Sequence, residues 1–165
     1  MLDQFPIHSD VTIRHAIQTD LRKLEWFGLL TPFRDHIERA YHRAQQGEMI
    51  FLVADLNSFP VGQVWVEIQA DCGLMMALRV LEPLQNMGIG TRLIHTAERA
   101  LIERGLHTAE IHVTLNNPGA KRLYERLGYS VTGDKISRWS YTPPDGEPQQ
   151  VEDHVWVLRK TLEVR

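Results

Sequence analysis

The sequence has a single cysteine, Cys72, among its 165 residues. It therefore lacks an internal disulfide, as is typical of proteins from a reducing compartment. Long apolar runs are also missing, because none approaches the roughly 20 residues that a membrane-spanning helix needs. Positive charge is not in excess, since 18 Lys and Arg residues are outnumbered by 21 Asp and Glu residues. The composition therefore gives no indication of a nucleic-acid or membrane partner, and we expect a cytoplasmic protein.

Two further absences narrow the class of protein. The eight histidines show no spacing with Cys, Asp or Glu that is typical of a metal site, so no metal is expected. The N-terminus has no basic region followed by an apolar run, so a secretory signal is not expected. What remains is a chain that is 43% hydrophobic and 24% charged, which is ordinary for a folded domain. We expect one domain over residues 1–165, with its core at about 11–162.

Apolar residues recur with the period of a strand in some segments of the chain and with the period of a helix in others. Residues 63–69 alternate between apolar and polar side chains, which predicts a strand. Further strands are predicted at 11–15, 49–55, 74–81, 109–115, 136–141 and 154–160. Helices are predicted after the capping residues Thr19, Thr31 and Asn117, and after Gly90. Strands interleaved with helices and ending in a hairpin predict a single α/β domain with a mixed sheet.

A glycine turn follows the apolar run 74–81 and precedes an amphipathic helix; it reads Gln85-Asn86-Met87-Gly88-Ile89-Gly90-Thr91. Such a turn directs several backbone N–H groups to one point, at the positive end of the helix dipole, which suits phosphate oxygens. A P-loop would need Lys after its last glycine, but Gly90 is followed by Thr91 and Arg92. A dinucleotide fingerprint would need a third glycine where Leu93 stands.

The turn instead resembles the acyl-CoA-binding motif of the GCN5-related N-acetyltransferase (GNAT) superfamily, Gln/Arg-x-x-Gly-x-Gly/Ala, as Gln85-x-x-Gly88-x-Gly90. The segment from Asn117 to Tyr129 resembles the family's second motif, Asn-x-x-Ala-x-x-Leu-Tyr-x-x-x-Gly-Phe/Tyr. Both occur in the family's order and separation, and weaker similarity covers nearly the whole chain. The resemblance implies a mixed, mostly antiparallel sheet flanked by helices, with acetyl-CoA (coenzyme A) as co-substrate.

The resemblance also implies which residues contact the cofactor. The backbone of residues 78–80 would pair with the pantetheine arm, and the N–H groups of residues 86–91 would hold the pyrophosphate. Asn117 would cap its helix and contact the arm, and Tyr124 would lie beside the cofactor sulfur. The predicted cofactor-binding residues are Leu78, Arg79, Val80, Gln85, Asn86, Met87, Gly88, Ile89, Gly90, Thr91, Asn117 and Tyr124.

Two residues are predicted to carry the chemistry. Tyr124 is the predicted acid, because a phenol with a reference pKa of about 10 can protonate a thiolate with a pKa of about 8.5. Glu67 is the predicted base, because it lies on the polar face of its strand and the resemblance implies a carboxylate or a water chain from this part of the sheet. His112, on the polar face of its own strand, and water are the alternatives. Each also has a purely structural explanation: Tyr124 as a core side chain, Glu67 as a solvated or ion-paired one, and His112 as a hydrogen-bonded one.

These residues predict an acetyl-CoA-dependent N-acetyltransferase that moves the acetyl group to a primary amine by direct attack in a ternary complex. The amine-bearing acceptor could be a small molecule or a protein. A regulatory module that binds acyl-CoA without turnover is the alternative from another class. The acceptor, the acyl length and the oligomeric state, including a homodimer, do not follow from the sequence.

Overall fold

One twisted sheet organises the molecule in the computed structural model, which describes residues 2–163; the remaining ends of the predicted domain, 1 and 164–165, lie outside the described residues. The strand order is β1-β2-β3-β4-β5-β7-β6, and every neighbouring pair is antiparallel except β4 and β5. This confirms the predicted mixed, mostly antiparallel α/β fold. The strands are β1 (Val11–His15), β2 (Met49–Leu56), β3 (Phe59–Ile68), β4 (Gly73–Val80), β5 (Thr108–Thr114), β6 (Ser130–Tyr141) and β7 (Gln149–Thr161).

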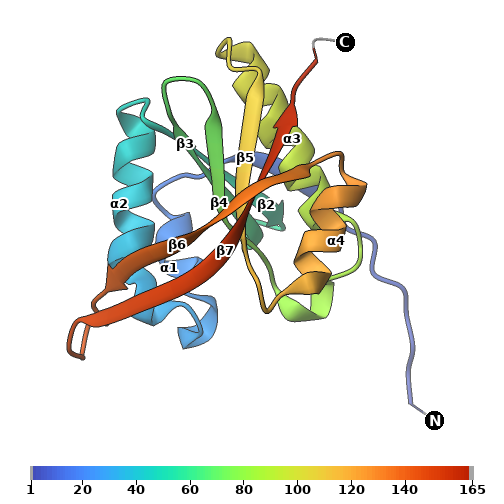
Figure 1. The fold of residues 1–165 in the computed structure, drawn as a ribbon. Coiled ribbons are helices and arrows are strands. Elements are labelled where there is room, and N and C mark those ends of the chain that lie inside the picture. The colour runs from blue at the N-terminus through green and yellow to red at the C-terminus, as the bar shows by residue number, and fades with distance from the viewer. Residues whose placement is uncertain (1, 164–165) are drawn as a thin grey trace.

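Helices cover both faces of the sheet (Figure 1). One face carries α1 (Asp20–Lys23), α2 (Arg34–Gln45) and the short turns η1 (Trp26–Gly28) and η2 (Thr31–Phe33). The other carries α3 (Ile89–Glu103) and α4 (Pro118–Arg126), with the short turn η3 (Glu82–Leu84) leading into the glycine turn. A separate apolar cluster lies under each layer, because strand side chains point alternately to the two faces. No helix among residues 2–163 is long and apolar enough to cross a membrane.

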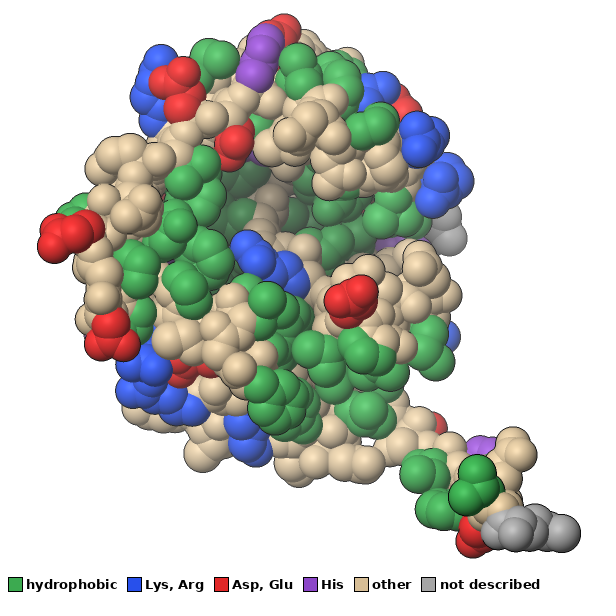
Figure 2. Space-filling view, turned by 90° about the horizontal axis from the view of Figure 1, so that it is seen from below, with side chains coloured by type: hydrophobic (Ala, Val, Ile, Leu, Met, Phe, Trp, Pro, Cys, Tyr) green, Lys and Arg blue, Asp and Glu red, His purple; other side chains and the backbone are tan. Residues whose placement is uncertain are grey.

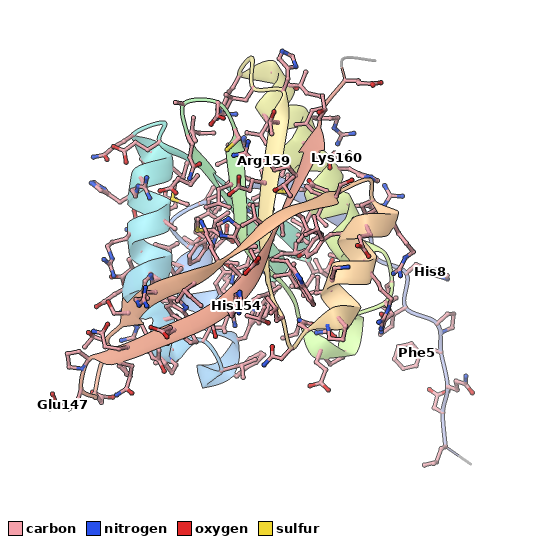
Figure 3. All side chains as sticks on the ribbon, in the orientation of Figure 1. Phe5, His8, Glu147, His154, Arg159 and Lys160 are labelled. Carbon is pink, nitrogen blue, oxygen red and sulfur yellow. The ribbon has the colours of Figure 1, made fainter. Side chains whose placement is uncertain are left out.

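The terminal hairpin differs from its prediction. The strands predicted at 136–141 and 154–160 are parts of the much longer β6 and β7, and Figure 3 marks Glu147 near the tip that joins them. Almost all of β6 is exposed at the edge of the sheet, so its first half has no apolar alternation to detect. The predicted cap at Thr31 is also wrong, because Thr31 starts a 3-10 turn and makes no side-chain capping bond.

A charged network joins β1 to α1. Arg14 donates to Asp20 (Nη1–Oδ2, 2.7 Å) and to Asp55 (Nε–Oδ2, 2.7 Å). Asp20 is only 1% exposed and also accepts the backbone N–H of Ile17 at 2.8 Å. Burial opposes ionisation of Asp20, but the bonds from Arg14 and Ile17 outweigh it and lower the pKa of this carboxyl. Its charge therefore stabilises the fold above the ordinary pKa of an aspartate.

Asp20→Asn is expected to lower the free energy of unfolding by about 2–3 kcal/mol at neutral pH, because Arg14 loses a charged partner in a buried place. Since the folded-state pKa is depressed, this contribution is fully present above the unfolded pKa near 4 and disappears as pH falls through the folded value. Urea unfolding should therefore give a deficit at about pH 7 that narrows by about pH 3. The exposed Asp10→Asn is the control; an Asp20→Asn deficit of equal size at both pH values would contradict the account.

Candidate active site at the splayed strands

A wedge opens between β4 and β5. The two strands pair for only three residues each, 73–75 with 109–111. Beyond this point Ala77 adopts a left-handed φ of 53°, and the pairing of β4 with β3 slips by one residue there. Such a bulge bends its strand, so β4 leaves β5 and a cavity of about 360 Å³ opens between them. The β5-facing backbone edge of residues 78–80 has no strand partner among the described residues, and it can pair with an extended amide chain.

The glycine turn lies beside a second cavity of about 610 Å³, which shares lining residues with the wedge. Asn86 and Gly88 adopt left-handed φ values of 61° and 84° and turn the chain into α3. Within residues 2–163, none of the N–H groups of residues 86–91 donates to a backbone carbonyl. A Cβ built on Gly90 would meet only Val80, at 3.8 Å, so the space above the helix start is open. This cradle of free donors fits phosphate oxygens.

Side chains at the start of the turn and at the start of α4 hold this geometry in place. Gln85 Nε2 donates to the carbonyl of Val80 at 2.9 Å, which ties the turn to the end of β4. Asn117 accepts the N–H of Ala120 at 3.1 Å, which confirms its predicted role as the cap of α4. Asn117 also lines the wedge, where the cofactor contact was predicted.

Tyr124 lies where the wedge and the turn cavity meet, because its side chain lines both. The ring is 9% exposed and packs edge-on against Tyr129, with 6.0 Å between centroids. Burial raises the pKa of Tyr124 to about 12, so the hydroxyl holds its proton at neutral pH. A phenol in this place can donate to a sulfur in the wedge.

A third cavity, of about 440 Å³, lies on the other face of the sheet, where α2 and the β6–β7 hairpin approach it. Its walls include Phe33, Trp65, Trp139 and Asp153, and it shares Arg79 and His112 with the wedge. Figure 2 shows a hollow on the lower face of the molecule, with hydrophobic side chains around it and basic atoms at its centre. A molecule in the third cavity would reach the wedge from the side opposite the glycine turn.

His112 is held by a chain of charged groups. Its Nε2 lies 2.6 Å from Glu110 Oε1, and Arg159 Nε donates to Glu110 Oε2 at 2.7 Å. Burial opposes ionisation of Glu110, but these two bonds outweigh it and lower its pKa. Because an ionised carboxylate only accepts hydrogen bonds, we assign the ring proton to Nε2, which leaves Nδ1 as the basic nitrogen.

Lys160, the residue after Arg159 on β7, points to the opposite face of the sheet. Figure 3 labels Arg159 and Lys160 on β7. Lys160 Nζ donates to Glu98 of α3 at 2.8 Å, and Glu98 also accepts the hydroxyl of Tyr129 at 2.9 Å. Because side chains of a strand alternate between the two faces of the sheet, Lys160 binds α3 on one face and Arg159 holds Glu110, the partner of His112, on the other.

Glu67 lies apart from Tyr124 and His112. It lies on the predicted face of β3, but its Oε1 accepts Arg43 Nη1 at 2.9 Å, and it is not among the residues that line the three cavities. The structure therefore brings Tyr124 and His112 to the wedge and does not bring Glu67 there. Its role as the base stays a prediction.

The sequence reasoning missed two features of the site. Glu110 could have been found, because residues two apart on a strand share a face, and Glu110 is two residues before His112. The place of the Arg79 side chain depends on the bulge, for which no local pattern exists. Within the described residues, no group of three potential His, Cys, Asp or Glu metal ligands is found.

Residues 17–129, more than half of the chain, match the family described as "Acetyltransferase (GNAT) family". The chain therefore belongs to this family. Among solved structures of similar fold is the PaiA N-acetyltransferase of Thermoplasma acidophilum in complex with coenzyme A, at 18% identity and a TM-score of 0.69 over 92% of this chain and 99% of that one.

Two further structures are similar to a comparable extent. The ribosomal-protein-S18-alanine N-acetyltransferase of Escherichia coli has 18% identity and a TM-score of 0.70 over 94% of this chain and 96% of that one. YncA, a putative acetyltransferase of Salmonella typhimurium with acetyl-CoA, has 16% identity and a TM-score of 0.71 over 95% and 96%. At these identities the likeness concerns the fold.

Proposed function

We propose that the protein is an acetyl-CoA-dependent N-acetyltransferase acting on a primary amine. The proposal rests on one observation: a wedge with an unpaired strand edge connects a phosphate cradle to a cavity on the opposite face, with Tyr124 and His112 in its walls. Acetyl-CoA would supply the acetyl thioester. Residues 78–80 would hold its pantetheine arm together with Asn117, and residues 86–91 would hold its pyrophosphate.

Direct attack of the amine on the thioester is favoured over an acetylated enzyme. Cys72, the single cysteine, is fully buried, donates to Gln69 Oε1 at 3.3 Å and does not line the three cavities. Burial also raises the pKa of its thiol, which opposes thiolate formation. In the direct reaction the amine nitrogen bonds to the acetyl carbon and the carbon–sulfur bond breaks. Tyr124 donates a proton to the departing sulfur, and a base takes one from the amine.

We assign the base to His112. It lines both the wedge and the third cavity, and Glu110 fixes the ring so that Nδ1 can accept a proton. Imidazole is suited to this task because it exchanges protons near neutral pH. Glu67, the base predicted from sequence, is the alternative, and it would act through water after leaving Arg43.

His112→Gln is expected to lower kcat about 100-fold at neutral pH, at the lower end of the effect of general acid–base catalysis. Without the imidazole, only amine that is already neutral reacts, so the rate should recover as pH approaches the amine pKa. Glu67→Gln should keep the wild-type pH profile. The measurement is release of free thiol from acetyl-CoA with a primary amine, followed over a range of pH.

The paired variants separate the two candidate bases, since each replaces one proton acceptor by an amide. If Glu67→Gln changes the pH profile and His112→Gln does not, the assignment of His112 is wrong and Glu67 takes its place. If Glu67→Gln raises KM alone, its carboxylate only attracts the cationic acceptor.

A further inference from the structure

Arg79 carries a charge that has no carboxylate partner among residues 2–163. Its guanidinium Cζ lies 5.4 Å from the centroid of the Phe33 ring, and the residue lines the wedge, the turn cavity and the third cavity. Across residues 2–163, its five N–H donors have no hydrogen-bond acceptor and no ion pair. A guanidinium keeps its charge in proteins, so the hollow holds a fixed cation with free donors.

Several other arginines are paired with carboxylates. Arg14 lies 2.7 Å from Asp20, Arg34 is 2.7 Å from Glu25, and Arg159 is 2.7 Å from Glu110. Desolvation by the surrounding walls lowers the pKa of the Arg79 guanidinium, but the residue is exposed to solvent where the cavities open. An acceptor that enters the third cavity can therefore reach its free donors.

The position of Arg79 indicates which substrate brings that anion. Its neighbours Leu78 and Val80 pack against the apolar cluster on the α3 side, where the phosphate cradle lies. Arg79 points to the opposite face and contacts Phe33, which packs on the α2-side cluster and lines the third cavity. The anion is therefore expected on the acceptor rather than on the cofactor phosphates.

The third cavity has a second charge of opposite sign. Asp153 lines it from β7 and accepts Trp139 Nε1 at 3.3 Å. A molecule with a carboxylate would match Arg79, and Asp153 would attract its ammonium into the cavity, whereas a polyamine would bring only cations toward Arg79. The volume of about 440 Å³ suits a small molecule.

We propose that Arg79 binds the carboxylate of the acceptor through its paired N–H groups, and that the acceptor is a free amino acid whose amine reacts beside His112. This inference rests on the proposed acetyltransferase function. A guanidinium and a carboxylate form two parallel hydrogen bonds, a geometry that lysine cannot reproduce.

The test compares L-phenylalanine, L-leucine and L-methionine with their carboxamides, which keep the amine and side chain but lose the carboxylate. The wild type should prefer the acids about 10- to 100-fold in kcat/KM, as expected for charged hydrogen bonds. Arg79→Leu should bring this ratio close to 1, and Arg79→Lys should restore only part of it. Arg39→Leu, which removes an exposed arginine of α2, should keep the wild-type ratio.

Binding is read separately from turnover, through the Tm with coenzyme A and the corresponding N-acetyl amino acid present. The N-acetyl amino acids should raise the Tm of the wild type further but not that of Arg79→Leu. If this shift appears without any turnover, Arg79 binds the carboxylate and the proposed catalysis fails instead. If coenzyme A alone stops stabilising Arg79→Leu, the side chain holds cofactor phosphates and the inference is overturned. Equal kcat/KM for acids and amides in the wild type would also overturn it.

Discussion

Tyr124→Phe is expected to lower turnover about 10²- to 10⁴-fold, the range of general acid catalysis, while acetyl-CoA binding changes little. The substitution keeps the ring, its place between the wedge and the turn cavity, and its packing on Tyr129. It removes only the hydroxyl, whose pKa burial raises to about 12 and which therefore carries a proton throughout the neutral range. The departing thiolate would then leave without a donor. Steady-state kcat measured at saturating acetyl-CoA checks this.

Tyr129→Phe is the matched control for the loss of a phenol. Tyr129 contacts Tyr124, but its hydroxyl donates to Glu98 and its side chain does not line the three cavities. We expect this variant to lose about 1 kcal/mol of stability through the broken hydrogen bond and to keep its turnover. If Tyr124→Phe also kept wild-type turnover, Tyr124 would not be the acid in the rate-limiting step.

Gly90→Glu should abolish the stabilisation of the protein by coenzyme A. At 100 times Kd, a ligand adds about 2.7 kcal/mol, which corresponds to a rise in Tm of roughly 5–10 °C for a chain of this size. The free protein has room for the side chain, because a Cβ on Gly90 meets only Val80 at 3.8 Å. The added carboxylate would occupy and repel the phosphate position in front of the free N–H groups. A thermal-shift titration of both proteins measures the difference.

Gly133→Glu on β6 adds the same side chain at a glycine with no neighbour within 4 Å of its Cβ position. It should respond to coenzyme A like the wild type, which separates the site-specific effect from the added charge. Gly88→Glu is less informative, because Gly88 has a left-handed φ of 84° and any side chain there strains the turn itself. A full coenzyme A response in Gly90→Glu would contradict the assignment of the turn to phosphate binding.

The parts of this site that follow from short segments of sequence could be predicted. Gly88 and the cap at Asn117 are local features, in which neighbouring residues set the backbone conformation and the structure has the expected form. The family resemblance rests on the same two segments, so the fold could be predicted from them as well. Alternation along a strand also placed Glu67 and His112 on their correct faces.

The parts of the site that depend on contacts between distant segments could not be predicted from the sequence. Nothing near Ala77 predicts its left-handed bulge, although that bulge bends β4 and accompanies the wedge. Glu67 was put before His112 because the family resemblance implies a carboxylate from this part of the sheet. Its pairing with Arg43 is made across 24 residues of chain, so no local pattern predicts it. The length of β6 was underestimated because pairing with β7, rather than an apolar pattern, defines this edge strand.

The most direct test of acetyl transfer is the release of free thiol from acetyl-CoA with and without a primary amine, with the amine product followed by mass. The panel should contain amino acids, a polyamine, an aminoglycoside and a peptide with a free N-terminus. Thiol release is expected to require both the protein and an amine, and one acetylated amine should form for each thiol. If acetyl-CoA raises the Tm but no amine increases thiol release, the protein is a module that binds acyl-CoA without turnover, and the proposed function is wrong.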